Sequence, residues 1–262
     1  KGRYDIHELL RQYAEEHLQE NGEVDAINNQ YTTYFSDFMM SRAPDIKGKR
    51  QIESLHEIEA DFDNILIAWQ VAVAHTNYEA LDKMMETIAL FCEMRALYQV
   101  GETLFDDAVN TLSQLNMNEV HPVFNRLRAR FVQVWMLRHR YPIPEYIQQL
   151  TNTCLQIAES QKDNLTVIIC CILKGMLLGF TNNLNEAMSY LDYALPLAEG
   201  HDAYYQGYIL RIVDNLFTFQ YYEDTPYTIE INRKNEQIAR QISNNHGIAD
   251  ALSHKSNRLW RQ

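Results

Sequence analysis

The chain has 262 residues, a net charge of -12 and an apolar fraction of 46%, with only 9 glycines and 6 prolines. This length allows one or two domains. The shortage of glycine and proline argues against sheets joined by tight turns and favours helices with short connections. An acidic chain repels a phosphate backbone, so we expect no direct contact with nucleic acid.

The cysteines, the apolar runs and the motifs indicate where the protein is located and which kinds of site it lacks. The four cysteines form no CxxC pair, which favours buried thiols in a reducing environment and predicts a cytoplasmic protein. No apolar run approaches the roughly 20 residues of a membrane span, so no membrane contact is expected. The sequence shows neither a cluster of metal ligands nor a GxSxG motif, and it predicts no metal site and no catalytic residue.

The segment RYDIHELLRQYAEEHL (residues 3–18) predicts a helix at the start of the chain. Asp5 is its expected N-cap, and Glu8 stands three residues later, as in a capping box. Because this helix follows Lys1 with no preceding segment, we expect the chain to be a piece of a longer protein. The first residues would then be the last part of a neighbouring domain.

A second helix is predicted over 24–41. The stretch RAPDIKGKRQ (42–51) is the most linker-like part of the sequence. It is the expected boundary between a first domain, residues 1–50, and a second domain, residues 51–262.

The second domain reads as a series of helices. Ser54 and Glu57 have the spacing of a capping box and are expected to open a helix in LHEIEADFDNILIAWQVAVAH. Short breaks separate the helices that follow, and no strand run with hairpin chemistry occurs. These helices are predicted over 78–96, 99–115, 122–139, 144–160, 164–181, 184–198, 203–221, 226–243 and 247–261.

Two stretches match the helix pair of tetratricopeptide repeats, which recur after about 34 residues. Such pairs need small residues where their two helices approach closely. ICCILKGMLLGFTNNLNEAMSYLDYALPLAE (169–199) fits both helices, and GETLFDDAV (101–109) fits the second. The sequence therefore predicts an all-α fold, a right-handed TPR-like solenoid of helical hairpins with a concave face. The matching positions are Gly175, Ala187, Leu191 and Ala194 in the first stretch and Gly101, Phe105 and Ala108 in the second.

The stretch 122–144 carries five arginines and no acidic residue. At 100° per residue, Arg126, Arg130 and Arg140 share one stripe of a helix, and Arg138 falls near its apolar side. One interpretation is a solvent-exposed face whose arginines form ion pairs with acidic side chains on adjacent helices. The other is a binding site for an anion or an acidic partner.

The stretch 202–230 is rich in aromatic side chains. Tyr204, Tyr208, Arg211 and Asn215 recur at helical spacing, so they line one face. Tyr and Arg are enriched where surfaces bind partners, although Tyr also fills the space between stacked helices. A further candidate is the apolar inner groove of the best repeat, formed by Ile172, Met176 and Phe180.

Two motifs near the start carry a family resemblance. Ile6-His7-Glu8 opens a helix as a hydrophobic-His-acid motif, and IEADFDNILIAW (58–69) looks like the segment LEAEHDNLRAAL that follows the winged helix in bacterial members. Over residues 1–115 the chain resembles the signal-transducing ATPases with numerous domains, known as STAND proteins. In that family a nucleotide-binding domain precedes a winged helix and a repeat array that senses the signal.

The resemblance implies a division of roles. Residues 1–50 would be the end of the winged helix with a connecting helix. His7 would contact the phosphate of ADP in the resting state, although Glu8 departs from the usual Asp. The ADP or ATP, with Mg²⁺, would sit in the upstream ATPase domain of the same chain. These residues contain no GxxxxGK[ST] loop, so they should hold no cofactor and have no enzymatic activity by themselves.

The leading hypothesis is the sensor and autoinhibitory region of a bacterial transcriptional regulator of this type. An unknown inducer, whether a protein, a peptide or a small molecule, would bind the array. One alternative is a scaffold whose repeats join partner proteins without a nucleotide switch. Another is an enzyme with a dispersed active site, which no motif supports.

Overall fold

The structure, a computed structural model, describes residues 7–115, 121–139, 142–221 and 225–261, leaving out the side chains of residues 8, 11, 15, 219–221 and 258–261. Within these ranges it contains thirteen α-helices, so the predicted all-α class is confirmed. The helices are α1 (Glu8–Asn21), α2 (Val24–Ile46), α3 (Gln51–Ala60), α4 (Phe62–Ala74), α5 (Tyr78–Met94), α6 (Tyr98–Gln114), α7 (Pro122–Arg138), α8 (Glu145–Gln161), α9 (Asn164–Phe180), α10 (Leu184–Glu199), α11 (Ala203–Tyr221), α12 (Pro226–Gln241) and α13 (Asn245–Arg261).

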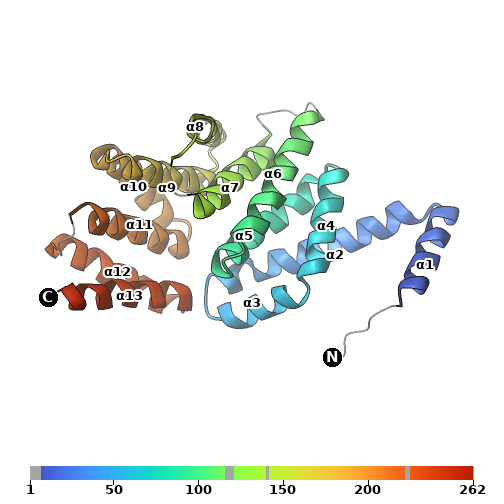
Figure 1. Cartoon of the computed structure of the whole chain (residues 1–262), viewed down its shortest axis with the longest axis horizontal. Helices are drawn as coiled ribbons and strands as arrows, with labels where there is room; N and C mark the ends of the chain where they lie inside the picture. The colour runs from blue at the N-terminus through green and yellow to red at the C-terminus, as the bar shows by residue number, and fades with distance from the viewer. Residues whose placement is uncertain (1–6, 116–120, 140–141, 222–224, 262) are drawn as a thin grey trace.

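The helices pack mostly against their neighbours in the chain, as in a helical array (Figure 1). Helices α5, α7, α9 and α11 also contact one another in that order, and α2 packs along α5. One hydrophobic cluster extends through this succession from Phe35 on α2 to Ile231 on α12. Helix α1 packs on α2 and lies at the opposite edge of the molecule from α12 and α13 (Figure 1).

Glycine allows the two helices of the best repeat to approach closely. A Cβ atom on Gly175 of α9 would come within 2.7 Å of Leu191 Cδ2 on α10. Leu191 and the flanking Ala187 and Ala194 are fully buried. Gly101 plays a similar part at the start of α6, where an added Cβ would meet Cys92 Cβ at 3.1 Å. The close contacts predicted from the repeat pattern are confirmed.

Six connections between helices share one backbone geometry. In each, a residue at the helix end is left-handed, with φ between 55 and 67°. The next backbone N–H donates to the carbonyl five residues earlier, at 2.8–3.0 Å. This is the Schellman ending, in which the left-handed residue is usually glycine. Among the described residues one of the six is glycine, and the set is Gly22, Thr76, Ala96, Lys162, Asn182 and Ser243.

Helix α2 continues past its predicted end at residue 41 and runs through Pro44 to Ile46, so that predicted end is wrong. Proline inside a helix costs about 3 kcal/mol, and tertiary contacts offset this cost. Ile46 is fully buried. Arg42 stacks over the Phe38 ring, 4.0 Å from its centroid, and its Nε donates to Glu57 Oε2 at 3.0 Å.

The predicted helix after Ser54 is instead two helices, α3 and α4, which break at Asp61. The predicted capping box of Ser54 and Glu57 is wrong, because Ser54 is fully buried inside α3 and the N-cap is Arg50. From α5 onward, every predicted helix agrees with the structure to within two residues at each end. In the part of the chain that the structure describes, no helix is long and apolar enough to cross a membrane.

Candidate functional site

The arginines of the stretch 122–144 separate along α7. Arg126 and Arg130 face a cleft beside the first half of the helix. Arg138, at the other end, donates from Nη1 to Glu102 Oε2 at 2.7 Å and is well exposed. Arg140 lies outside the described residues. The two described members of the predicted stripe, Arg126 and Arg130, therefore reach one cleft, whereas Arg138 lies apart from it.

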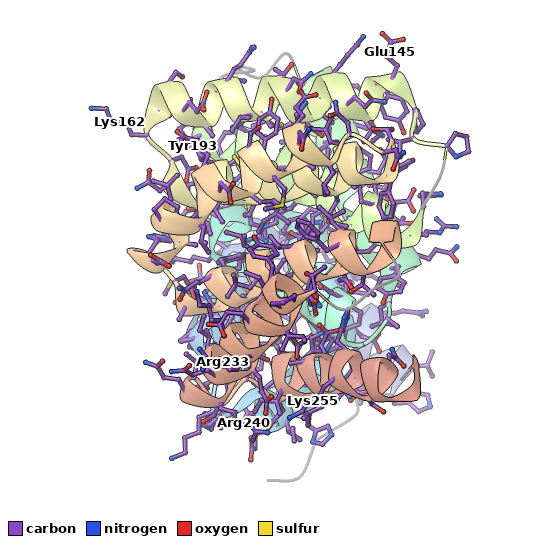
Figure 2. All side chains as sticks on the ribbon, turned by 90° about the vertical axis from the view of Figure 1, so that its left-hand side faces the viewer. Glu145, Lys162, Tyr193, Arg233, Arg240 and Lys255 are labelled. Atoms are coloured by element: carbon purple, nitrogen blue, oxygen red, sulfur yellow. The ribbon has the colours of Figure 1, made fainter. Side chains whose placement is uncertain are left out.

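We call this depression the α7 cleft. It has a volume of about 550 Å³ and lies where the first halves of α5 and α7 meet the turn between α8 and α9. Lys162, at that turn, projects away from the body of the molecule (Figure 2). The cleft is lined by Asp82, Met85, Glu86, Pro122, Arg126, Arg130, residues 161–166, Ile169 and His201.

Arg126 forms one wall of the α7 cleft. Its Nε donates to Asp163 Oδ2 at 2.6 Å, and its Nη1 donates to Asp82 Oδ1 at 2.8 Å. Asp163 is also the N-cap of α9, where its Oδ1 accepts the Thr166 backbone N–H at 3.3 Å. A single guanidinium thus joins α5 to the turn between α8 and α9.

Arg130 lies at the floor of the α7 cleft and is buried, with 2% of its surface exposed. It donates to two neutral oxygens, Gln133 Oε1 and Tyr205 Oη, each at 2.8 Å. The carboxylate of Glu86 is 3.6 Å away. At this position, the interpretation of the arginine stripe as a solvated face is wrong, because the side chain is enclosed by α5, α7 and α11.

Four helices meet around the Glu86 carboxylate. Its Oε1 accepts the Tyr205 hydroxyl at 2.7 Å and lies 3.3 Å from Lys47 Nζ. Lys47, at the end of α2, also donates to Asp202 Oδ2 at 2.6 Å. Tyr205 accepts from Arg130 and donates to Glu86 at the same time. These side chains join α2, α5 and α7 to α11.

The charges around Glu86 favour its carboxylate over its protonated form. Burial alone would raise the pKa of the Glu86 carboxyl, but the nearby Arg130 and Lys47 outweigh burial, so that pKa lies below its usual value. Burial raises the pKa of the Tyr205 hydroxyl well above its usual value. Tyr205 therefore keeps its proton and remains a donor to Glu86.

The hydrogen bonds continue from Arg130 towards the C-terminal helices. Gln133 Nε2 donates to Glu93 Oε2 at 3.3 Å, and Arg211 Nη2 donates to Glu93 Oε1 at 3.0 Å. Arg211 also stacks over the Tyr208 ring, 4.1 Å from its centroid. We call the whole set the inner network, which consists of Lys47, Glu86, Glu93, Arg130, Gln133, Asp202, Tyr205, Arg211 and His246.

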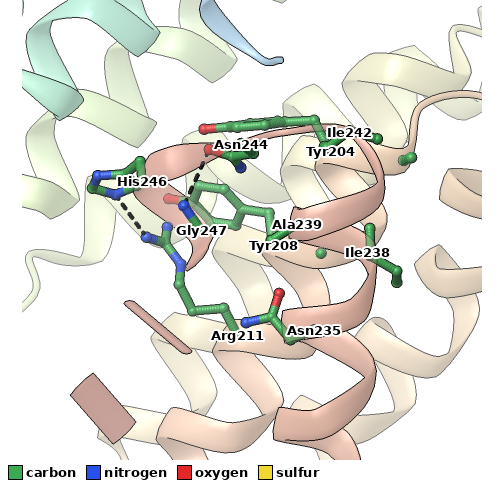
Figure 3. A pocket seen from close by; sticks show the side chains of 12 residues that line it. Tyr204, Tyr208, Arg211, Asn235, Ile238, Ala239, Ile242, Asn244, His246 and Gly247 are labelled. Carbon is green, nitrogen blue, oxygen red and sulfur yellow. Dashed lines mark hydrogen bonds between the residues drawn. The ribbon is translucent and has the colours of Figure 1, made fainter. Parts of the chain in front are cut away.

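Tyr204, Tyr208 and Arg211 surround a small cavity between α11, α12 and α13 (Figure 3). Its volume of about 20 Å³ is room for a single water molecule. Figure 3 shows His246 beside Arg211, whose Nη1 lies 3.4 Å from His246 Nε2. Both tyrosines are buried. Whether any of these predicted side chains contacts a ligand stays a prediction.

The turn before the last helix, α13, contacts the turn between α2 and α3. Gln51, the first residue of α3, donates from Nε2 to Asn244 Oδ1 at 2.9 Å. Its Oε1 accepts the His246 backbone N–H at 2.8 Å. We call this pair of bonds the closing contact. It joins the turn between α2 and α3 to the turn between α12 and α13, through the side chains of residues 193 positions apart.

The remaining predicted residues lie apart from these clusters. His7 is the exposed N-cap of α1, and its Nδ1 accepts the Leu9 backbone N–H at 3.3 Å. Asp5, the expected cap, lies outside the described residues. Asn215 is partly buried on α11. In the predicted inner groove Ile172 is buried, Met176 is partly buried and Phe180 is 44% exposed.

Sequence reasoning missed the acidic half of the inner network. Glu93 is buried and Glu86 is partly buried on α5, whose other buried residues are all apolar except Thr87. Two carboxylates seven residues apart in such a helix were a usable signal, since charged side chains are rarely buried without partners. Gln51 and His246 carried no comparable signal.

No protein-family model matches this chain, and no curated protein matches its sequence. Among the described residues, no three His, Cys, Asp or Glu side chains are grouped so that they could hold a metal ion.

Proposed function

We propose that this chain is the sensor and autoinhibitory region of a larger regulatory ATPase of the STAND type. The array would be a right-handed solenoid of TPR-like hairpins that binds an inducer in the α7 cleft. Two lines support this proposal: the resemblance of Ile6-His7-Glu8 and residues 58–69 to the family, and a cleft whose volume lies within the range of ligand sites, roughly 300–1,000 Å³.

One observation carries the proposal: a hydrogen-bonded path leads from the α7 cleft to the closing contact. It starts at Arg130, on the cleft floor, and passes through Gln133 and Glu93 to Arg211. Arg211 lies against His246, whose backbone N–H bonds to Gln51. A group that draws Arg130 towards the cleft therefore pulls on the far end of this path.

The proposed switch has two states of the array, closed and open. A ligand shifts such an equilibrium only by its difference in affinity for the two states. A ligand that binds Arg130 or Glu86 competes with Gln133, Tyr205 and Lys47, which hold the closed state together. It would therefore bind the open state better. In the parent protein, opening would release the ATPase from its ADP-bound resting state.

His7 supplies the proposed link to the nucleotide. Its exposed position at the N-cap of α1 leaves the imidazole free to face another domain. In the proposal, an upstream domain of the same chain holds ADP or ATP with Mg²⁺ and His7 contacts the phosphate. The parent gene tests this part directly, because a GxxxxGK[ST] loop must be encoded upstream.

The path can be tested by fluorescence energy transfer across the closing contact. Cysteines introduced at the exposed Glu53 and Gln241 would carry the two dyes. The native thiols are buried, and burial raises the pKa of Cys92 to about 12, so they should stay unlabelled. A second labelled pair, at Gln156 on α8 and Asp192 on α10, does not cross the closing contact and reports whether the fold is intact.

We expect Arg130→Gln to lower the transfer between residues 53 and 241 and to leave the second pair unchanged. Arg138→Gln, which breaks an arginine–carboxylate pair outside the α7 cleft, is the matched control and should change neither. A double-mutant cycle of Arg130→Gln with Gln51→Ala should show a coupling of about 0.5–3 kcal/mol. Additive effects and unchanged transfer would refute the relay.

The scaffold alternative is favoured by one different observation. Leu9, Leu10 and Tyr13 of α1 are each at least 60% exposed, and clustered exposed apolar side chains often mark interaction sites. A scaffold needs no coupling between the α7 cleft and the closing contact. The same double-mutant cycle therefore separates the two functions.

A further inference from the structure

The charges of the α7 cleft are of both signs and lie side by side. On the floor, Arg130 Nη2 is 3.6 Å from Glu86 Oε1. On the wall, Arg126 is held between Asp82 and Asp163. The Asp82 and Arg126 side chains are both more than one third exposed, at 39% and 34%, so this pair can exchange partners with a ligand.

A ligand of one sign fits this arrangement poorly. An anion that bound Arg126 and Arg130 would face the carboxylates of Glu86, Asp82 and Asp163 at close range. A cation bound to those carboxylates would face the two guanidiniums. On the floor, where the Arg130 and Glu86 side chains are only 3% and 20% exposed, one of these charges would then lose its partner, which is strongly unfavourable.

A ligand that carries both signs replaces each pair that it breaks. Its carboxylate can take the guanidinium of Arg126 or Arg130 in the bidentate geometry that arginine favours. Its ammonium group can take the carboxylate released from that arginine, Asp82 on the wall or Glu86 on the floor. Met85, Leu165 and Ile169 also line the cleft and offer apolar contacts for a side chain.

We infer that the α7 cleft binds a zwitterion, a free amino acid or a short peptide with an unblocked amino group and an unblocked carboxylate. The inference rests on the proposed function in taking the α7 cleft as the ligand site of the array. It goes beyond that function by naming the class of inducer.

The test uses the full chain in a thermal-shift screen followed by titration calorimetry. The probes are the twenty free amino acids, unblocked tripeptides such as trialanine and trileucine, and the N-acetylated and C-amidated forms of each. Inorganic phosphate, acetate and ethylamine report on ions of a single sign. We expect at least one unblocked probe to raise the melting temperature, and each blocked form of it to bind about tenfold more weakly or worse.

Variants then locate the site. Glu86→Gln keeps the shape of the side chain and removes its charge, so it should weaken the unblocked probe about tenfold. Asp82→Asn, at a more exposed position, is the second variant in case the first does not fold. Arg138→Gln is the control, because its partner Glu102 lies outside the α7 cleft, and it should leave the affinity unchanged.

Three results would overturn the inference: a flat screen of all unblocked probes, equal binding of blocked and unblocked forms, or binding of phosphate or acetate alone. In the last case the sensor proposal would survive with an anionic inducer. If a zwitterion binds but leaves the transfer between residues 53 and 241 unchanged, the ligand class stands and the proposed switch is refuted.

Discussion

The contact between α9 and α10 and the contact between α5, α7 and α11 are made of opposite chemistry. In the first, Gly175 lies against Leu191 between fully buried alanines. In the second, the buried side chains include Glu93, Arg130 and Tyr205. Helix α9 links the two regions, because it packs against α10 and also contacts α7 and α11.

In the proposed switch, this difference indicates where the array would open. An apolar contact gains its stability from burial and depends on shape, so small chemical changes in the solvent hardly affect it. A buried polar contact is stable only while every charge keeps a partner, and a competing ligand or a proton can remove one. We therefore expect the apolar contact to hold the hairpins together and the inner network to decide how they are arranged.

The largest effect is expected from breaking one ion pair of the inner network. Glu93→Leu leaves the mostly enclosed Arg211 guanidinium, whose side chain is 16% exposed, without its carboxylate and should lower the free energy of unfolding by up to about 3 kcal/mol. The double variant Glu93→Leu with Arg211→Met should recover most of that loss, because no charge is then left unpaired. Urea unfolding measures both.

The matched control is Glu230→Leu on α12. Its partner Arg233 is exposed, so the loss of the pair leaves no buried charge and should not be detectable. If Glu93→Leu were as mild as this control, the inner network would not contribute to the stability of the closed array.

The apolar contact should respond to volume instead. Gly175→Ala places a Cβ 2.7 Å from Leu191 Cδ2 and should cost about 1–3 kcal/mol through overpacking. Gly200→Ala is the control, since the nearest atom to its added Cβ is the Pro196 carbonyl oxygen at 3.8 Å. Equal melting temperatures for the two variants would contradict the close approach of α9 and α10.

A smaller effect, of opposite sign, is expected at the left-handed turns that connect the helices. Ala96 has φ of 55°, a conformation that strains a residue with a Cβ. Ala96→Gly should therefore raise the free energy of unfolding by about 0.5–1 kcal/mol. Asn182→Gly should gain less, because asparagine adopts this conformation more readily, and thermal melting of the two variants ranks them.

The smallest effect is expected from pH. Burial, and then the charge of Arg211, lower the pKa of the His246 imidazole below its usual value. The unfolded chain therefore binds this proton more readily than the folded chain. The stability from the neutral imidazole is complete above about pH 6.5 and falls as the pH decreases towards the lower folded-state pKa.

His246→Gln should remove this part of the pH dependence below about pH 6.5, as followed by urea unfolding at each pH. His56 is exposed on α3, so His56→Gln is the control for replacing a histidine outside the inner network. If the free energy of unfolding of the wild type and of His246→Gln depended on pH in the same way, His246 would not contribute to the pH dependence of stability.

The helices were largely predictable from local sequence, and the inner network was not. Pro122 and Pro226 mark the starts of α7 and α12, and such signals act within one turn of helix. The bond between Arg211 and Glu93 joins residues 118 positions apart, and no local pattern encodes that pairing. Pro44 shows the reverse error: a reliable local breaker is overridden by the burial of Ile46.

The α7 cleft was predictable in part. The spacing of Arg126 and Arg130 placed them on one face, and the structure brings both to the cleft. Their carboxylate partners come from α5 and from the turn before α9, so the balance of charge in the cleft became visible only in three dimensions. In the proposed zwitterion site, this balance of charge, more than the arginines themselves, would decide which ligand binds.

The six left-handed turns repeat one joint at separate places in the array. From Thr76 to Ala96 and from Lys162 to Asn182 the same joint recurs after 20 residues, and the helices between them, α5 and α9, are equally long. Main-chain hydrogen bonds define each joint, so its geometry is the same for glycine, threonine, alanine, lysine, asparagine and serine. The joints therefore constrain the sequence less than the inner network, in which each side chain needs its particular partner.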